Sequence, residues 1–194
     1  MCVVGLSGCP QLLCDVGVTD LCETYGITYV SNGADSGTVP VDGAEYQEGD
    51  IATVKHNTGG LGRSGYSFAG WNTASNGGGT SYSSGESLVM EFANITLYAK
   101  WSQNPTYTVT YNPNSASSGS VPTDSTSYEN GMTVTVLSNT GNLARTGHSF
   151  VGWNTLADGN GTTYTSGNTF EMGSANVTLY AKWSQNPTYT VTYN

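Results

Sequence analysis

Short stretches of the chain alternate between apolar and polar residues with a period of two. The clearest are residues 95–101 and 177–183, which end in Trp101 and Trp183. This period is typical of a strand with one buried face. Further β-rich runs occupy residues 107–112, 132–136 and 148–153. Asn-Pro, Asn-Gly and glycine-rich breakers separate the runs, and no window has a convincing helical stripe. The pattern therefore predicts a mainly β protein.

The whole pattern returns after 82 residues. Residues 25–106 align without a gap with residues 107–188, and about 46 of the 82 aligned pairs are identical. Such self-similarity predicts two tandem structural units, each with four or five short strands. Residues 1–24 have no counterpart at this offset and form a separate N-terminal segment. Residues 189–194 repeat the first six residues of a unit, which makes them the first strand of an incomplete third one.

The composition excludes several classes of partner. Only 10% of the residues are charged, the net charge is −9, and the five Lys and Arg residues are scattered, so the chain has no basic stripe for nucleic acid. No stretch approaches the roughly 20 apolar residues of a membrane span. The 13 Tyr, 4 Trp and 4 Phe residues in periodic positions supply a small core, which argues against disorder.

Cysteines occur only in the N-terminal segment. They are Cys2, Cys9, Cys14 and Cys22, and their spacing fits neither a metal site nor haem attachment. We expect disulfides that stabilise a segment too short for its own core, in an oxidising compartment, with three pairings left open. An alternative is a lipoprotein cleavage box at residues 6–9, although no basic start and no long apolar run precede it.

Two motifs recur at equivalent places in the two units. GYSFAGWNT is followed by NITLYAKW in the first unit, and GHSFVGWNT by NVTLYAKW in the second. Each pair follows an opening YxxTY strand and a VP dipeptide. With these motifs both units resemble the Listeria-Bacteroides repeat, the internalin B-repeat type. The resemblance implies a compact β-grasp-like module, carried in tandem on secreted or surface-attached bacterial proteins as a spacer, adhesion or interaction unit. The cysteine-bearing segment and the abrupt end depart from the family pattern.

The resemblance implies no enzymatic activity, and the duplication points the same way. His56 aligns with Ser138, and His148 aligns with Tyr66, so neither histidine keeps its place in both units. The units hold no other general base that works near neutral pH. We therefore expect no catalytic residue and no cofactor.

Aromatic residues are the candidates for ligand contact. Trp101 and Trp183 lie in alternating strands and are expected in the core. Trp71 and Trp153 end a strand beside a polar loop, where a tryptophan is either core or a stacking platform for a sugar. The predicted ligand-contact residues are Trp71, Trp153, Tyr98 and Tyr180. Such a surface would bind a glycan or a host or cell-surface receptor.

Polar loops and lysines carry weaker signals. The loop at residues 158–162 has the calcium-like sequence DGNGT, but its counterpart at residues 76–80 lacks the carboxylate, so we expect a hairpin loop and no metal site. Lys100 and Lys182 are expected in solvent, with isopeptide crosslinks to Asn as the alternative. N-x-T sequons, relevant only in a glycosylating host, start at Asn94, Asn160 and Asn176.

The last six residues suggest an assembly hypothesis. Ordering a terminal strand costs backbone entropy, and pairing along one edge barely offsets that cost. We therefore expect Tyr189, Val191 and Tyr193 to fill a groove on a neighbouring subunit, which gives an extracellular or cell-surface filament assembled head to tail by strand donation. Two alternatives remain open. One is a monomeric spacer or stalk fragment of a bacterial adhesin, whose last strand rests on the second unit; the other is a glycan- or receptor-binding module.

Overall fold

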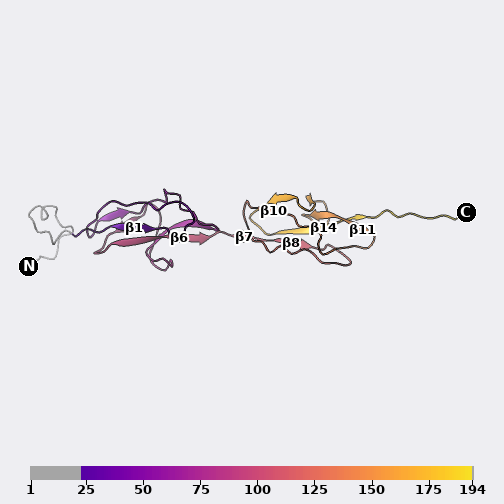
Figure 1. The fold of residues 1–194 in the computed structure, drawn as a ribbon, viewed down its shortest axis with the longest axis horizontal. Coiled ribbons are helices and arrows are strands. Elements are labelled where there is room, and N and C mark those ends of the chain that lie inside the picture. Colours follow the sequence, from indigo (N-terminus) through magenta and orange to yellow (C-terminus); the bar gives the residue numbers. More distant parts are fainter. Residues whose placement is uncertain (1–22, 194) are drawn as a thin grey trace, which may run out of the picture. The chain divides into compact units, whose positions relative to one another are not determined.

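The computed structural model describes residues 23–193, and the four cysteines with their predicted disulfides lie outside the described residues. The chain divides between Asn104 and Pro105 into two compact units, called repeat 1 and repeat 2 below (Figure 1). Residues 23–193 contain strands, turns and loops but no helix. The prediction of a mainly β chain with two tandem modules is confirmed.

Repeat 1 is built on a four-stranded sheet in the order β1-β6-β3-β4. The first and last strands of the repeat lie side by side and run parallel, whereas β3 is antiparallel to both of its neighbours. The strands of this sheet are β1 (Ile27–Val30), β3 (Tyr66–Asn72), β4 (Ser81–Tyr82) and β6 (Ile95–Gln103).

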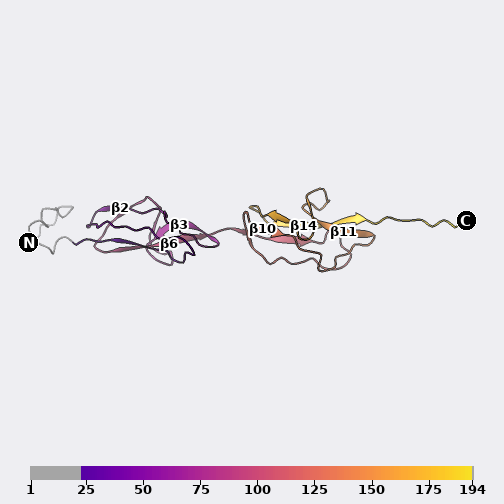
Figure 2. The same ribbon diagram turned by 45° about the horizontal axis from the view of Figure 1, so that its top comes forward.

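A second, smaller layer completes repeat 1. It is the antiparallel pair β2 (Ile51–Thr53) and β5 (Ser87–Val89), and Figure 2 shows β2 apart from β3 and β6. The pair and its flanking loops cover the main sheet, and the buried side chains of both layers form one core. Its members are Ile27, Tyr29, Ala52, Val54, Leu61, Trp71, Leu88, Met90, Leu97 and Ala99.

Repeat 2 has the same construction. Its main sheet has the order β12-β11-β14-β8, with β8 parallel to β14, and its second layer pairs β10 with β13. A further short pair, β7 with β9, lies where the chain enters the repeat. The strands are β7 (Thr106–Tyr107), β8 (Val109–Asn112), β9 (Tyr128–Glu129), β10 (Thr133–Thr135), β11 (His148–Asn154), β12 (Thr163–Tyr164), β13 (Thr169–Glu171) and β14 (Val177–Gln185).

The period-two pattern read from the sequence places β6 and β14 as expected. Leu97 and Ala99 in β6, like Leu179 and Ala181 in β14, have no exposed surface. Lys100 and Lys182, which directly follow the buried alanines, lie on the opposite face of their strands. Each long strand therefore forms the floor of the core of its repeat.

A β-bulge changes the register in the middle of β3. Phe68 lies opposite Trp101, but Trp71 lies opposite Ala99, so β3 has one extra residue over this span. The bulge shifts the alternation by one position. As a result Phe68 and Trp71, three residues apart, both pack on the core, although strict alternation would place them on opposite faces.

Glycine is required in the bulge for two reasons. Gly70 and its counterpart Gly152 have positive φ angles of 109° and 144°. A Cβ atom at Gly70 would lie 2.6 Å from the carbonyl oxygen of Tyr82, and one at Gly152 would lie 2.5 Å from that of Tyr164. The adjacent strand therefore leaves no room for a side chain at either bulge.

In each repeat the chain enters at one end and leaves at the other. Ile27, at the start of β1, lies beside Ile95, at the start of β6. From there β6 continues for nine residues to Gln103, roughly 30 Å at the usual rise of a strand. The same relation holds between β8 and β14.

Candidate functional site

The tryptophans predicted to contact a ligand belong to the core. Trp71 and Trp153 are completely buried, and each indole N–H donates to a backbone oxygen, of Lys55 in repeat 1 and of Leu137 in repeat 2, at 2.9 Å. The bulge turns their rings inward, so neither can serve as a stacking platform. This part of the predicted contact surface is wrong.

The predicted contact tyrosines have a different environment. Tyr98 and Tyr180 lie on the face of β6 and β14 opposite the buried leucines, and they are half-buried. A ligand-contact role for these two residues stays a prediction. Trp101 and Trp183 are also half-buried, and they pack against the core as expected.

A polar hollow of about 350 Å³ opens on repeat 1 beside the β3–β4 loop. We call it the amide hollow because three asparagines contribute to its lining. Two cationic and two aromatic side chains complete it. The residues that matter for its chemistry are Asn32, Asn72, Asn76, Arg63, Lys100, Tyr66 and Trp101.

Asn32 joins the turn after β1 to the wall of the amide hollow. Its backbone has a φ of 48°, a conformation that asparagine tolerates better than most residues. The side-chain N–H groups donate to the carbonyl oxygens of Ser75 and Ala99, both at 2.9 Å. Its own carbonyl oxygen accepts from the indole of Trp101, also at 2.9 Å. Asn114 makes the same contacts in repeat 2.

Asn72 organises the floor of the hollow. It is 1% exposed, and its side-chain oxygen accepts from the N–H groups of Ala74 and Gly79. Its amide nitrogen donates to the carbonyl oxygens of Gly77 and Gly79 and to the hydroxyl of Ser81. The amide is thus bonded on both sides, and it fixes the loop between β3 and β4.

The sequence interpretation missed this asparagine. Asn-rich loops read as turns, and a turn asparagine is normally exposed. The available signal was that Asn72 and Asn154 keep the same place after each tryptophan although the loop residues around them change. Asn154 makes the equivalent set of hydrogen bonds in repeat 2.

The two cations of the hollow are held by neutral partners. The guanidinium of Arg63 lies over the ring of Tyr66, 4.2 Å from its centroid. Lys100 Nζ donates to the hydroxyl of Ser81 at 2.8 Å. The ion pair found in residues 23–193 is elsewhere, between Lys55 and Asp42 at 3.9 Å. Lys182 makes the matching bond to Thr163.

The loop at residues 158–162, with its calcium-like sequence, is a hydrogen-bonded hairpin loop. The carboxylate of Asp158 accepts from the backbone and side-chain N–H groups of Asn160. Within residues 23–193 no three His, Cys, Asp or Glu side chains come together as metal ligands. The loop shape is explained by Asn154 instead.

In repeat 1, His56 is not among the residues that line the amide hollow. His56 stands close to the position of Gly85, and the His148 ring nitrogen Nδ1 lies 2.9 Å from the carbonyl oxygen of Thr146. In repeat 2, His148 occupies the place that Tyr66 has at the amide hollow.

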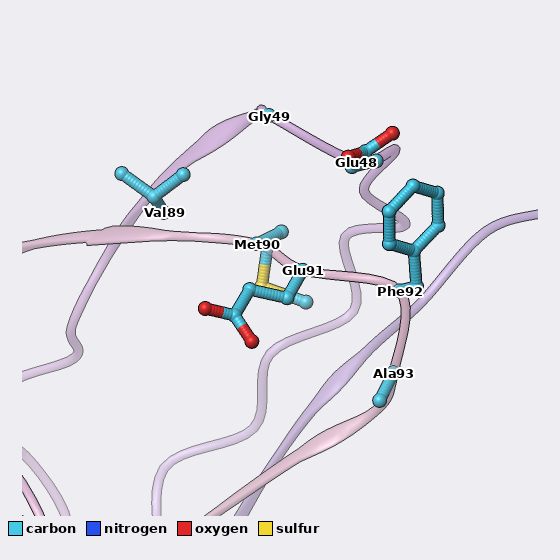
Figure 3. Close-up of a pocket in the computed structure, with 7 residues that line it drawn as sticks. All are labelled: Glu48, Gly49, Val89, Met90, Glu91, Phe92 and Ala93. Carbon is cyan, nitrogen blue, oxygen red and sulfur yellow. The ribbon is translucent and has the colours of Figure 1, made fainter.

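An exposed apolar patch distinguishes repeat 1 from repeat 2. Ile51 and Val89 are cross-strand partners in the second layer and are 69% and 60% exposed, and Phe92 is 71% exposed. Figure 3 shows Phe92 beside Glu48, with Glu91 pointing the other way. Val89 and Phe92, with Glu48 and Glu91, border a hollow of about 460 Å³. The equivalents of the three apolar residues in repeat 2 are Thr133, Glu171 and Ser174.

The last residues of the chain are exposed. Tyr189, Val191 and Tyr193 are 87%, 75% and 91% exposed, and no strand follows Gln185 in the described part of the chain. The alternative in which this segment rests on repeat 2 is therefore wrong. The place next to β14 is already filled by β8.

Comparison with known proteins gives a family match for each repeat. The model of the Listeria-Bacteroides repeat domain matches residues 25–100 and 107–182. These two segments are most of repeat 1 and most of repeat 2 as the structure describes them.

Two longer bacterial proteins and one solved structure are similar to the chain. The "Putative Gly-rich membrane protein" of Evansella cellulosilytica is 39% identical over 174 residues, which are 87% of this chain and 19% of that protein. The "Putative membrane protein" of the same organism is 44% identical over 94 residues, 48% of this chain and 14% of that protein. The chain therefore spans less than a fifth of either relative. Streptococcal High Identity Repeats in Tandem (SHIRT) domains 3-4 from a cell surface protein match with a TM-score of 0.33 and 13% identity, covering 86% of this chain and all of that one.

Proposed function

Because the chain belongs to the Listeria-Bacteroides repeat family, we propose that it is a non-enzymatic tandem-repeat spacer of a bacterial cell-surface or secreted protein. The observation that carries the proposal is the parallel pairing of the first and last strands of each repeat. This pairing makes the chain enter at one end of the repeat and leave at the other. A repeat of this kind adds length between whatever precedes and follows it.

Other properties of the described residues support a spacer. Each repeat has its own core, and the hydrogen bonds that fix the loops occur in the same form in both repeats. The chain is poor in charge and rich in Ser, Thr and Asn, so the polar surface is largely hydroxyl and amide. Residues 23–193 contain no helix, and so none that is long and apolar enough to cross a membrane. The two longer relatives are named as membrane proteins, which supports a location of this chain at a membrane.

A repeat-number series tests the spacer function. Additional copies of residues 107–188 are inserted in register, and the maximal dimension of each protein is measured by small-angle X-ray scattering. We expect each added copy to lengthen the molecule by roughly 30 Å, the run of one long strand. A maximal dimension that grows only as fast as that of a compact particle of the same mass would overturn the proposal.

We further propose that the terminal segment associates with another copy of the chain. Residues 189–194 have the same sequence as residues 107–112, in which Val109 and Tyr111 are 3% and 4% exposed. The segment therefore has the chemistry of an inserted edge strand, yet the side chains of residues 189–193 are exposed. Within residues 23–193 both places for such a strand are filled, by β1 and β8. Donation to repeat 1 of another copy would displace β1, and head-to-tail contacts of this kind extend into filaments.

Two variants separate strand donation from non-specific association. Tyr193 corresponds to buried Tyr111, whereas Thr192 corresponds to exposed Thr110. We expect Tyr193→Asp to abolish polymers in negative stain and in analytical ultracentrifugation, because a buried charge has no partner there. Thr192→Asp is the matched control and should leave them intact. A monomeric wild-type chain, or polymers that survive in Tyr193→Asp, would refute strand donation.

A further inference from the structure

The few cations of this acidic chain recur at equivalent sequence positions in the two repeats. Of the five Lys and Arg residues, four form two equivalent pairs, Arg63 with Lys100 and Arg145 with Lys182. In repeat 1 both members of the pair line the amide hollow. A chain with a net charge of −9 has many carboxylates that could neutralise them. The two cations nevertheless face a polar hollow.

The charges of Arg63 and Lys100 are not consumed by ion pairs in the part of the chain that the structure describes. Arg63 lies over the ring of Tyr66, and Lys100 uses one donor on the hydroxyl of Ser81. Asp35 accepts a hydrogen bond from the backbone N–H of Ser64, and the bonds from Ser64 lower its pKa more than the charge of Arg63 does. Donors of both cations therefore remain for a group that enters the hollow.

The other walls of the amide hollow favour a ring with hydroxyl groups. Tyr66 and Trp101 offer half-buried aromatic surface, which packs well against the C–H face of a sugar. The side-chain oxygen of Asn32 and the side-chain nitrogen of Asn76 add groups that can pair with hydroxyls, while the other atom of each amide bonds the protein backbone. A volume of about 350 Å³ is at the lower end of the range for small-molecule sites.

We propose that the amide hollow of repeat 1 binds a sugar that carries a carboxylate, of the uronic-acid class. The carboxylate lies between Arg63 and Lys100, and the ring lies against Tyr66 and Trp101. A neutral sugar would leave both cations unused, and a simple inorganic anion would leave the aromatic and amide walls unused. This site goes beyond the spacer function and does not depend on it.

Repeat 2 provides a natural comparison for this site. Arg145 and Lys182 are kept, but Asp158 replaces Asn76 and brings a negative charge to the rim. Leu156 replaces Ala74 and is 51% exposed, and His148 replaces the tyrosine under the arginine. The loop also closes in on the lysine, since a Cβ at Gly159 would lie 3.7 Å from Lys182 Cε. An acidic sugar is therefore expected to prefer repeat 1.

The proposal is tested with two probes that share one ring. Methyl β-D-glucuronide carries a carboxylate where methyl β-D-glucoside carries a hydroxymethyl group. Each is titrated to about 10 mM into the full, isotope-labelled chain, and amide shifts are followed by NMR. We expect the glucuronide to shift residues around Arg63, Asn76 and Lys100, with an affinity at least about tenfold above that of the glucoside.

Matched variants assign the site to repeat 1. Arg63→Gln and Lys100→Gln should each weaken glucuronide binding about tenfold, whereas Arg145→Gln and Lys182→Gln should leave it unchanged. The dispersed amide spectrum of each variant shows that it folds. The proposal is overturned if the glucuronide causes no shifts, if the glucoside binds equally well, or if sulfate binds the same residues as tightly. Equal losses in the repeat 1 and repeat 2 variants would also overturn it.

Discussion

Tyr29 and Trp71 pack edge to face in the core of repeat 1, with ring centroids 4.7 Å apart and planes at 69°. Both side chains form hydrogen bonds with the backbone of Lys55, two residues after the end of β2. The hydroxyl of Tyr29 accepts from the N–H of Lys55 at 2.8 Å, and the indole of Trp71 donates to its carbonyl oxygen at 2.9 Å. This pair therefore joins the main sheet to the chain that follows β2.

Repeat 2 preserves the pair although the residue it holds has changed. Tyr111 and Trp153 have the same centroid distance of 4.7 Å, and they bond the backbone N–H and carbonyl of Leu137. Because lysine in one repeat and leucine in the other satisfy the same bonds, the contact depends on the backbone. The aromatic pair is thus a structural device of the repeat, independent of the side chain at position 55 or 137.

Loss of the Tyr29 hydroxyl should weaken repeat 1. Tyr29→Phe keeps the ring packing but leaves the N–H of Lys55 without its acceptor, so we expect a loss of about 1–3 kcal/mol in the free energy of unfolding of repeat 1. Urea unfolding, followed by NMR signals of each repeat, measures it. Tyr66→Phe is the control, and its effect should stay within about 0.5 kcal/mol. Equal losses in both variants would contradict the role given to the hydroxyl.

Alkaline pH should destabilise both repeats. Burial raises the pKa of Tyr29 and of Tyr111, although in each case the backbone N–H that donates to the hydroxyl acts in the opposite direction. A folded-state pKa above the unfolded value of about 10 means that the stabilisation is complete below that pH and is lost as pH rises through the folded pKa. We expect the free energy of unfolding to be flat below about pH 9 and to fall above about pH 10.

The double variant Tyr29→Phe, Tyr111→Phe provides the control for this pH dependence. It removes the two groups and should reduce the slope of the free energy of unfolding above about pH 10. Tyr46 and Tyr128 also have raised pKa values, through burial and their contacts with Asp42 and Asp124, so part of the slope remains. An unchanged slope in the double variant would show that these buried hydroxyls do not titrate on unfolding.

The bulge glycine should be more sensitive than a positive-φ glycine that has open space around its Cβ position. Gly152→Ala places a Cβ against the carbonyl of Tyr164, whereas Gly131, with a φ of 82°, has no atom within 4 Å of that position. We expect Gly152→Ala to cost more than about 2 kcal/mol and Gly131→Ala about 1 kcal/mol. Gly173→Ala, with neither strain nor neighbour, should be neutral in thermal unfolding. Similar losses in all three variants would contradict this order.

The buried amide of Asn154 should dominate the stability of its loop. Asn154→Ala leaves buried donors and acceptors of the loop unpaired, and we expect a loss of about 2–4 kcal/mol. Asn160→Ala, in the exposed part of the same loop, should cost less than about 0.5 kcal/mol. Thermal unfolding of the two variants and hydrogen exchange of residues 155–163 provide the measurements. Unchanged hydrogen exchange of residues 155–163 in Asn154→Ala would show that the Asn154 amide does not stabilise the loop.

The exposed apolar patch should contribute little to stability. Replacement of Ile51 and Phe92 by the repeat 2 residues, Ile51→Thr and Phe92→Ser, is expected to change the free energy of unfolding by less than about 0.5 kcal/mol. The same double variant should reduce the fluorescence of the hydrophobic dye ANS, because less apolar surface is accessible. A large loss of stability would show that the two side chains support the core.

Alternation along the strands made much of the fold predictable. The pattern in residues 95–101 places Leu97 and Ala99 inside, and the 82-residue offset carries the same prediction to repeat 2. Alternation fails at Trp71, because the bulge at Gly70 shifts the register by one residue. A glycine before a tryptophan in both repeats is the signal of a bulge, but its effect on facing needs the position of the neighbouring strand.

The amide hollow was harder to predict than the core. Its walls come from the turn after β1, the residues before β3, both ends of β3, the β3–β4 loop and β6, which are spread over about 70 residues of the sequence. No local motif joins Asn32 to Trp101, although the structure bonds them at 2.9 Å. Repetition did mark the participants, since Asn32, Arg63, Asn72, Lys100 and Trp101 all recur after 82 residues.

The parallel pairing of β1 with β6 also determines how a repeat responds to tension. Force applied to its two ends acts at the start of β1 and at the end of β6, in opposite directions along neighbouring strands. The four residue pairs from Ile27–Ile95 to Val30–Tyr98 are then loaded in shear, and their hydrogen bonds must break at the same time before the strands separate. Each repeat thus has the geometry of a mechanical clamp that resists being pulled apart lengthwise.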